Sequence, residues 1–185
     1  LAPELRALVS ARIERFDRDW SRYRDDSLVA HIARRPGRHR LPADAGPLLA
    51  LYAELHEATR GRVSPLVGGA LAASGFGPRL AGVPDAVPSF EDALAWDGEH
   101  LETAAPVLID VGAAGKGHLV DLVSGILAEA GIARSVVDGS GDLRIREVPM
   151  RIALEHPADP RKAVGVAELA DGALYIAMEF LDGMS

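Results

Sequence analysis

The stretch DVGAAGKGHLVD, residues 110–121, joins a short apolar run to a long amphipathic pattern. The run at residues 107–109 predicts a buried strand, and the helical spacing of apolar residues over 115–130 predicts the clearest helix of the chain. Glycines at such a junction let backbone N–H groups approach a ligand, and the helix N-terminus adds partial positive charge. Because Lys116 adds a full charge, the stretch predicts a turn that handles phosphate. The alternative is a tight structural turn with a solvated lysine.

A second glycine turn, residues 139–142 (GSGD), follows a predicted strand at 135–137. Strands joined by a right-handed crossover lie in one sheet, so we expect the two turns to face one crevice. Asp138 and Asp142 would then bind ribose hydroxyls, orient Lys116, or simply cap backbone amides.

The rest of the chain predicts an α+β fold, with helices first, one strand–helix–strand crossover, and then a strand meander. The expected elements are helices at residues 5–20, 28–33, 42–59 and 90–96, a basic loop at 33–40, an irregular but packed stretch at 63–88, and strands near 98–103, 143–146, 151–155, 163–169 and 173–176. The arginines of the basic loop are expected to be solvated, with a phosphate or protein contact as the alternative.

Composition and residue spacing argue against several classes of function. The net charge of −7 argues against broad nucleic-acid binding, and the absence of cysteine excludes disulfides and thiolate chemistry. No apolar run reaches the roughly 18 residues that a membrane span needs. No histidine pair has metal-site spacing; His118, in the first turn of the predicted helix, either faces a ligand or lies on the surface. The chain as given is expected to be cytoplasmic, or exported if a leader was removed.

Five segments in order resemble the ApbE flavin-transferase family, the FAD:protein FMN transferases. DVGAAGKGHLVD is similar to the family signature DxGGxAKGYxVD. The other four resemble family segments in the same order along the chain: RFDRDWSRYRDDS (15–27), RGRVSPLVGGALAASGFG (60–77), VVDGSGDLR (136–144) and RIALEHPADP (151–160).

The resemblance implies an ApbE-like fold, a sheet flanked by helices, and an enzyme. Family members use Mg²⁺ and FAD, move FMN onto a Ser or Thr of a target flavoprotein, and release AMP. By position, the resemblance implies catalytic roles for Lys116 and Asp142 and a backbone metal ligand at Gly115. It also implies that flavin or nucleotide contacts come from the following residues: Tyr23, Arg62, Val63, Ser64, Gly112 and His118.

Five positions depart from the family pattern: Ser64, Ala113, Gly115, His118 and Asp138. Gly115 stands where the family usually has alanine, a change that a backbone carbonyl ligand tolerates. The family's C-terminal segments, whose Asp and Thr hold the metal, have no counterpart in the tail MEFLDGMS (178–185). We therefore expect residues 1–185 to form a single ApbE-like domain whose C-terminal part is incomplete. Two alternatives stay open: a non-catalytic flavin-nucleotide-binding module, and an unrelated α+β protein whose glycine turns are structural.

Overall fold

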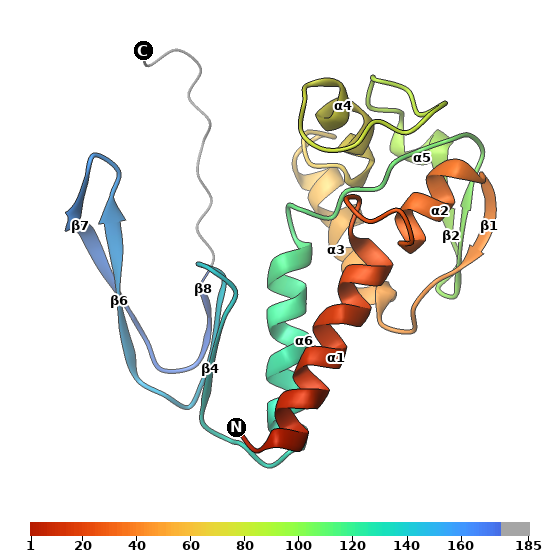
Figure 1. The fold of residues 1–185 in the computed structure, drawn as a ribbon. Coiled ribbons are helices and arrows are strands. Elements are labelled where there is room, and N and C mark those ends of the chain that lie inside the picture. The colour runs from red at the N-terminus through yellow and green to blue at the C-terminus, as the bar shows by residue number, and fades with distance from the viewer. Residues whose placement is uncertain (175–185) are drawn as a thin grey trace. The chain divides into compact units, whose positions relative to one another are not determined.

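The computed structural model describes residues 1–174 and confirms the α+β prediction (Figure 1). These residues group into two compact units, one formed by Ser10–His118 and the other by Leu1–Val9 with the chain from Leu119 onward. Each unit is described by itself. The prediction of one domain over residues 1–185 stays a prediction.

Helices form the core of the unit Ser10–His118. Helix α1 (Pro3–Trp20) enters it with Phe16 and Trp20 buried, and α2 (Leu28–Arg34) buries Val29 and Ile32. Ser27 caps α2, because its hydroxyl accepts the N–H of Ala30 at 3.1 Å. Helix α3 (Ala45–Ala58) follows and buries Leu48, Leu49 and Tyr52. These three helices confirm the predicted pattern.

The sheet of this unit has the order β1-β3-β2 and is antiparallel throughout (Figure 1). Its strands are β1 (Gly37–Arg40), β2 (Leu94–Trp96) and β3 (His100–Thr103). Two predictions were wrong here. The basic stretch at 33–40 was expected to be a loop, but its last four residues alternate between half-buried and exposed and pair with β3. The helix expected at 90–96 ends early, as α5 (Phe90–Ala93), because the next three residues also find a partner in β3.

The expected strand at 107–109 is also a correction. Its side chains are at most 2% exposed, as predicted, but the run belongs to no sheet. It instead packs under the 3₁₀ turn η1 (Pro65–Val67) and the helix α4 (Gly68–Ala73). Asp110 N–H donates to the carbonyl of Pro65 at 2.8 Å, and a Cβ on Gly68 would collide with the carbonyl of Leu108. The apolar run therefore reports burial, which a short run does not distinguish from strand pairing.

The second unit contains most of α6 (Gly115–Glu129) and the remaining strands. Strands β4 (Ser135–Asp138), β5 (Leu143–Arg146) and β8 (Gly172–Leu174) form an antiparallel sheet in the order β4-β5-β8. Strands β6 (Met150–His156) and β7 (Asp159–Leu169) form a separate two-stranded ribbon (Figure 1). The part of the predicted last strand beyond Leu174 lies outside the described residues. Within residues 1–174, no helix has both the length and the apolarity to cross a membrane.

Candidate functional site

The glycine-rich turn ahead of α6 is held by its own backbone and by Asp110. One carboxylate oxygen of Asp110 accepts the N–H of Gly112 at 2.7 Å, and the carbonyl of Val111 accepts the N–H of Gly115 at 2.6 Å. Lys116 is exposed in the first turn of α6, whereas Gly117 beside it is buried. The N–H groups of a helix's first turn have no partners within the helix, so together with Lys116 they are suitable donors for an anion.

Two glycines of this turn lie where no larger residue fits. A Cβ on Gly112 would be 2.8 Å from the Asp110 carboxylate oxygen that receives its N–H. A Cβ on Gly115 would be 2.7 Å from Cγ2 of Val111 and 3.4 Å from the ring of Phe16. The close packing at Gly115 gives a physical reason for glycine at this position, where the family usually has alanine.

Arg22 joins three segments of the chain around the turn. Its Nε pairs with the second carboxylate oxygen of Asp110, and one Nη donates to the carbonyl of Phe76. Its other Nη donates to the hydroxyl of Tyr23 at 2.7 Å. The side chains of Arg22 and Asp110 are only 6% and 13% exposed. This buried pair fixes Asp110, which in turn fixes Gly112, so Arg22 positions the entry to the turn. No sequence pattern singled out Arg22.

Tyr23 lies beside this pair and is 65% exposed. The guanidinium carbon of Arg22 lies 4.4 Å from the centre of its ring. Phe76, whose carbonyl Arg22 holds, is 63% exposed. The unit thus presents an exposed aromatic ring at Tyr23, linked through Arg22 to the turn. That placement is compatible with the predicted contact between Tyr23 and the flavin or nucleotide, which stays a prediction.

His118 lies in the first turn of α6 and is half-buried. Its N–H donates to the carbonyl of Ala114 at 3.0 Å, and its ring is tilted against Phe16 with centroids 6.3 Å apart. The ring is therefore placed by packing against α1, on the same helical turn as Lys116.

Tyr52 lies on the buried face of α3. It is fully buried, and its hydroxyl makes no hydrogen bond of ordinary length and angle. Burial raises the pKa of Tyr52 to about 12; the backbone N–H groups of Ala114 and Ala113 oppose this shift, and the Asp110 carboxylate adds to it.

The segment predicted to line the flavin, residues 62–64, follows α3. Arg62 is exposed and borders a surface hollow of about 580 Å³ with Ala58, Thr59 and Arg60. Val63 N–H donates to the hydroxyl of Thr59 at 3.0 Å. Ser64 is 5% exposed, and its hydroxyl accepts the N–H of Leu66 at 3.2 Å to cap η1. Within the described chain, Arg62 is the member of this segment whose side chain is most open to a ligand.

The second glycine turn belongs to the other unit. Asp138 accepts the N–H of Gly141 at 3.0 Å, and the carbonyl of Asp142 accepts the N–H of Gly139 at 2.9 Å. Asp138 therefore has the capping role. Asp121, on α6, lies 3.6 Å from an Nη of Arg144. The expectation that the two turns face one crevice rested on a strand at 107–109, which the structure lacks, and it stays a prediction.

Two of the four arginines at 33–40 pair with acids. Arg34 donates to the carboxylate of Asp25 at 2.7 Å, and Arg38 to that of Asp97 at 2.9 Å. This arrangement favours a solvated surface.

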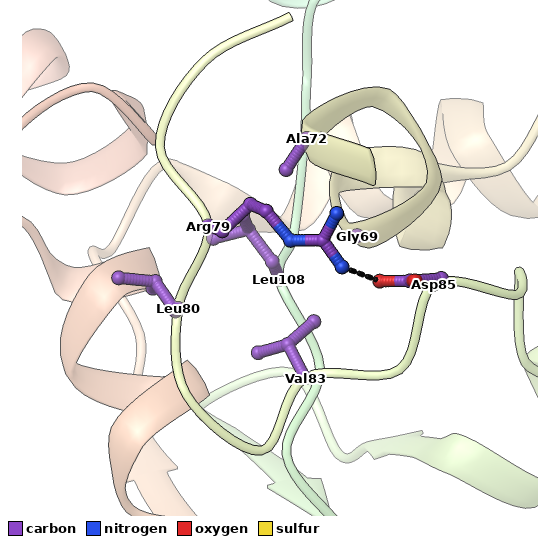
Figure 2. A pocket seen from close by; sticks show the side chains of 7 residues that line it. All are labelled: Gly69, Ala72, Arg79, Leu80, Val83, Asp85 and Leu108. Atoms are coloured by element: carbon purple, nitrogen blue, oxygen red, sulfur yellow. Dashed lines mark hydrogen bonds and ion pairs between the residues drawn. The ribbon is translucent and has the colours of Figure 1, made fainter. Parts of the chain in front are cut away.

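A small cavity lies between α4 and the loop that follows it, with the side chains of Leu80, Val83 and Leu108 directed into it (Figure 2). Arg79 and Asp85 also line it and form an ion pair 2.6 Å long (Figure 2). The cavity measures about 10 Å³, room for one water at most, so it is a packing defect under the loop.

The described residues supply few of the oxygen donors that a magnesium site needs. Within residues 1–174, no three His, Asp or Glu side chains come together to hold a metal ion. Gly115, the predicted carbonyl ligand, supplies one hard oxygen from the first turn of α6. Mg²⁺ requires an octahedral set of oxygens, so the described residues do not by themselves make a magnesium site.

Comparison with known proteins decides the family. A sequence profile of the ApbE family matches residues 2–176. The chain belongs to the ApbE family. Membership accounts for the glycine turn and its flanking segments in the order in which they occur along the chain.

Among ApbE relatives, a curated FAD:protein FMN transferase from Vibrio cholerae serotype O1 is 27% identical, over 95% of this chain and 58% of its own length. The structure of the flavin transferase ApbE from Vibrio cholerae matches with a TM-score of 0.79 and 25% identity, over 94% of this chain and 62% of that one. The apo flavinyl transferase ApbE from Pseudomonas stutzeri matches with a TM-score of 0.75 and 28% identity, over 91% and 58%. The chain thus spans about three fifths of the length of these ApbE proteins.

Proposed function

We propose that this protein is an FAD:protein FMN transferase. It would bind FAD and move the FMN half to a Ser or Thr hydroxyl of a target flavoprotein, releasing AMP in a Mg²⁺-dependent reaction. The hydroxyl oxygen forms a bond to the FMN phosphorus, the bond from that phosphorus to the bridging oxygen breaks, and AMP leaves with that oxygen. The hydroxyl proton passes to AMP or to water.

One observation carries the proposal: a glycine turn fixed by Asp110 and Arg22 leads into a helix N-terminus whose first turn carries the exposed, charged Lys116. Phosphoryl transfer depends mainly on positioning and on neutralising phosphate charge. A preformed turn of this kind supplies both, and the family to which the chain belongs supports FAD as the source of the phosphates.

The proposed roles follow the positions of the residues. Lys116 and the backbone at residues 112–117 would bind the diphosphate, Tyr23 and His118 would contact the nucleotide or flavin, and Arg62 would contact the flavin from its hollow. Asp142 would act from the second turn. Mg²⁺ dependence rests on the resemblance, with Gly115 as one ligand, and no step of the reaction is assigned to it here.

The test is a transfer assay. The protein is incubated with FAD and a candidate flavoprotein, with Mg²⁺ or with EDTA, and covalent flavin is read by in-gel fluorescence while AMP is measured in solution. Equal amounts of AMP and covalent flavin, both absent with EDTA, are expected. Retention of FAD without transfer would instead favour the non-catalytic binding module, and no affinity for FAD would overturn both flavin functions.

A further inference from the structure

Phe76 is an exposed aromatic residue whose backbone is fixed on both sides. Its side chain is 63% exposed. Its N–H donates to the carbonyl of Leu71 at 2.8 Å, at the end of α4, and its carbonyl accepts a hydrogen bond from Arg22. A single exposed apolar side chain is ordinary on a protein surface. What distinguishes Phe76 is the residue beside which Arg22 holds it.

That residue is Tyr23, which is 65% exposed. Its hydroxyl accepts a hydrogen bond at 2.7 Å from the guanidinium that also holds the carbonyl of Phe76. A Cβ on Gly77, the residue after Phe76, would lie 2.9 Å from Cε1 of Tyr23. Two exposed aromatic residues, far apart in the sequence, therefore come from adjoining segments of the surface.

This aromatic pair, Tyr23 and Phe76, lies next to the start of the glycine turn. The guanidinium carbon of Arg22 covers one face of the Tyr23 ring, 4.4 Å from its centre, so the exposed part of the ring includes its other face. The same guanidinium pairs through Nε with Asp110, whose carboxylate accepts the N–H of Gly112. The width of one guanidinium group thus separates the aromatic pair from the carboxylate that fixes the turn.

We propose that Phe76 and Tyr23 together bind one planar ring of the substrate, with Phe76 as a contact residue outside the set that the family resemblance implies. A dinucleotide carries a fused heterocycle on each side of its diphosphate, so a diphosphate at the glycine turn brings one heterocycle to the aromatic pair. Aromatic side chains bind such rings by stacking and by edge-to-face contact. The inference rests on the proposed function, which supplies FAD; its isoalloxazine and its adenine share the required chemistry.

The test compares the wild-type protein with two variants of Phe76 and one control. Phe76→Leu removes the aromatic ring and keeps an apolar side chain, whereas Phe76→Tyr keeps the ring. The control is Trp96→Leu, because Trp96 is an exposed aromatic residue of β2 that lines a separate hollow with Arg38 and Asp97. The Kd values for FAD and FMN are measured in Mg²⁺ buffer by quenching of flavin fluorescence, and that for ADP by displacement of FAD. The melting temperature is measured without ligand.

Phe76→Leu should bind FAD at least about fivefold more weakly, the lower end of what one stacked base contributes. A similar loss is expected for only one half of the substrate: for FMN if the isoalloxazine meets the aromatic pair, and for ADP if the adenine does. Phe76→Tyr and Trp96→Leu should bind FAD as wild type does. The melting temperature of Phe76→Leu should stay close to that of wild type, because the side chain is exposed.

Four results would overturn the inference: wild-type affinity for FAD in Phe76→Leu, an equal loss for FMN and ADP, an equal loss in Phe76→Tyr or Trp96→Leu, or a melting temperature that falls together with affinity. An equal loss for both halves would mean that the diphosphate turn, and not a ring contact, was disturbed. A wild-type protein without affinity for FAD would overturn the proposed function and the inference with it. That outcome differs from wild-type binding that Phe76→Leu leaves unchanged, which overturns the inference alone.

Discussion

At the scale of single residues, Arg22 links the start of the turn to two other segments of the chain. It reaches Asp110, the carbonyl of Phe76 and the hydroxyl of Tyr23 from one guanidinium. Arginine suits this position because its planar fork presents several donors in fixed directions. Lysine would satisfy the charge of Asp110 but not the other two acceptors.

Arg22→Ala should therefore lower the free energy of unfolding by about 3–5 kcal/mol, since it leaves the Asp110 carboxylate buried without its partner. Urea denaturation measures this loss. Arg38→Ala is the matched control, because Arg38 pairs with Asp97 on the surface, where both side chains are more than half exposed. Little change is expected for the control. Equal losses in the two variants would contradict a central role for Arg22.

The buried Tyr52 makes stability depend on alkaline pH. Its pKa is raised from 10.0 to about 12 in the folded protein. Between these values the unfolded chain loses the phenolic proton and the folded chain keeps it, so the unfolded state binds fewer protons and stability falls as pH rises. The stability lost between pH 10 and 12 should be about 2–3 kcal/mol larger in wild type than in Tyr52→Phe, as measured by urea denaturation at each pH. Identical pH profiles would show that the hydroxyl is not desolvated.

At the scale of elements, two glycines of α6 differ in how closely they are packed: Gly115 at its start is tightly packed, and Gly125 in its middle is not. Gly115→Ala places a Cβ 2.7 Å from a methyl of Val111, so we expect a loss of about 1–3 kcal/mol. Gly125→Ala, in the same helix, meets no atom within 4 Å, and we expect a gain of about 0.5–1 kcal/mol from helix propensity. Thermal unfolding of the two variants checks this. A stabilising Gly115→Ala would show that the turn does not pack closely on Val111.

The elements show what a sequence pattern can and cannot predict. Helices α3 and α6 follow from apolar spacing, because each buries apolar residues at helical intervals. The same spacing predicts α1, although Leu8 and Ile13 of its apolar stripe are exposed. Strand β1 was not predicted, since its residues GRHR are polar and it forms by pairing with β3. The run at 107–109 has the composition of a strand, but it packs against η1 and α4 instead of pairing in a sheet.

The candidate site, too, could be predicted only in part from the sequence. The glycine turn and Lys116 were found because glycine and charge at a helix start have a direct physical meaning. Arg22 was missed because its role depends on what lies beside it in space, and nothing in the sequence reports that it reaches both Asp110 and Phe76.

At the scale of the whole molecule, the net negative charge of the chain opposes the binding of an anion, whereas the glycine turn favours it. The chain carries a net charge of −7, yet the proposed substrate FAD carries a negatively charged diphosphate. Attraction must then be local, from the helix N-terminus and Lys116, and a local attraction is screened by salt only in part. Lys116 is consequently the residue on which the account depends most.

The most direct measurement is the FAD affinity of Lys116→Ala beside that of Lys162→Ala. Lys162, the other lysine of the chain, lies on β7 near Asp159 and is 71% exposed, so its replacement changes the net charge equally without touching the turn. Lys116→Ala should weaken FAD binding by about 10- to 100-fold, the size of one charged hydrogen bond to phosphate, while Lys162→Ala leaves it unchanged. Equal affinities in wild type and both variants would contradict the account, because the glycine turn would then not be the phosphate site.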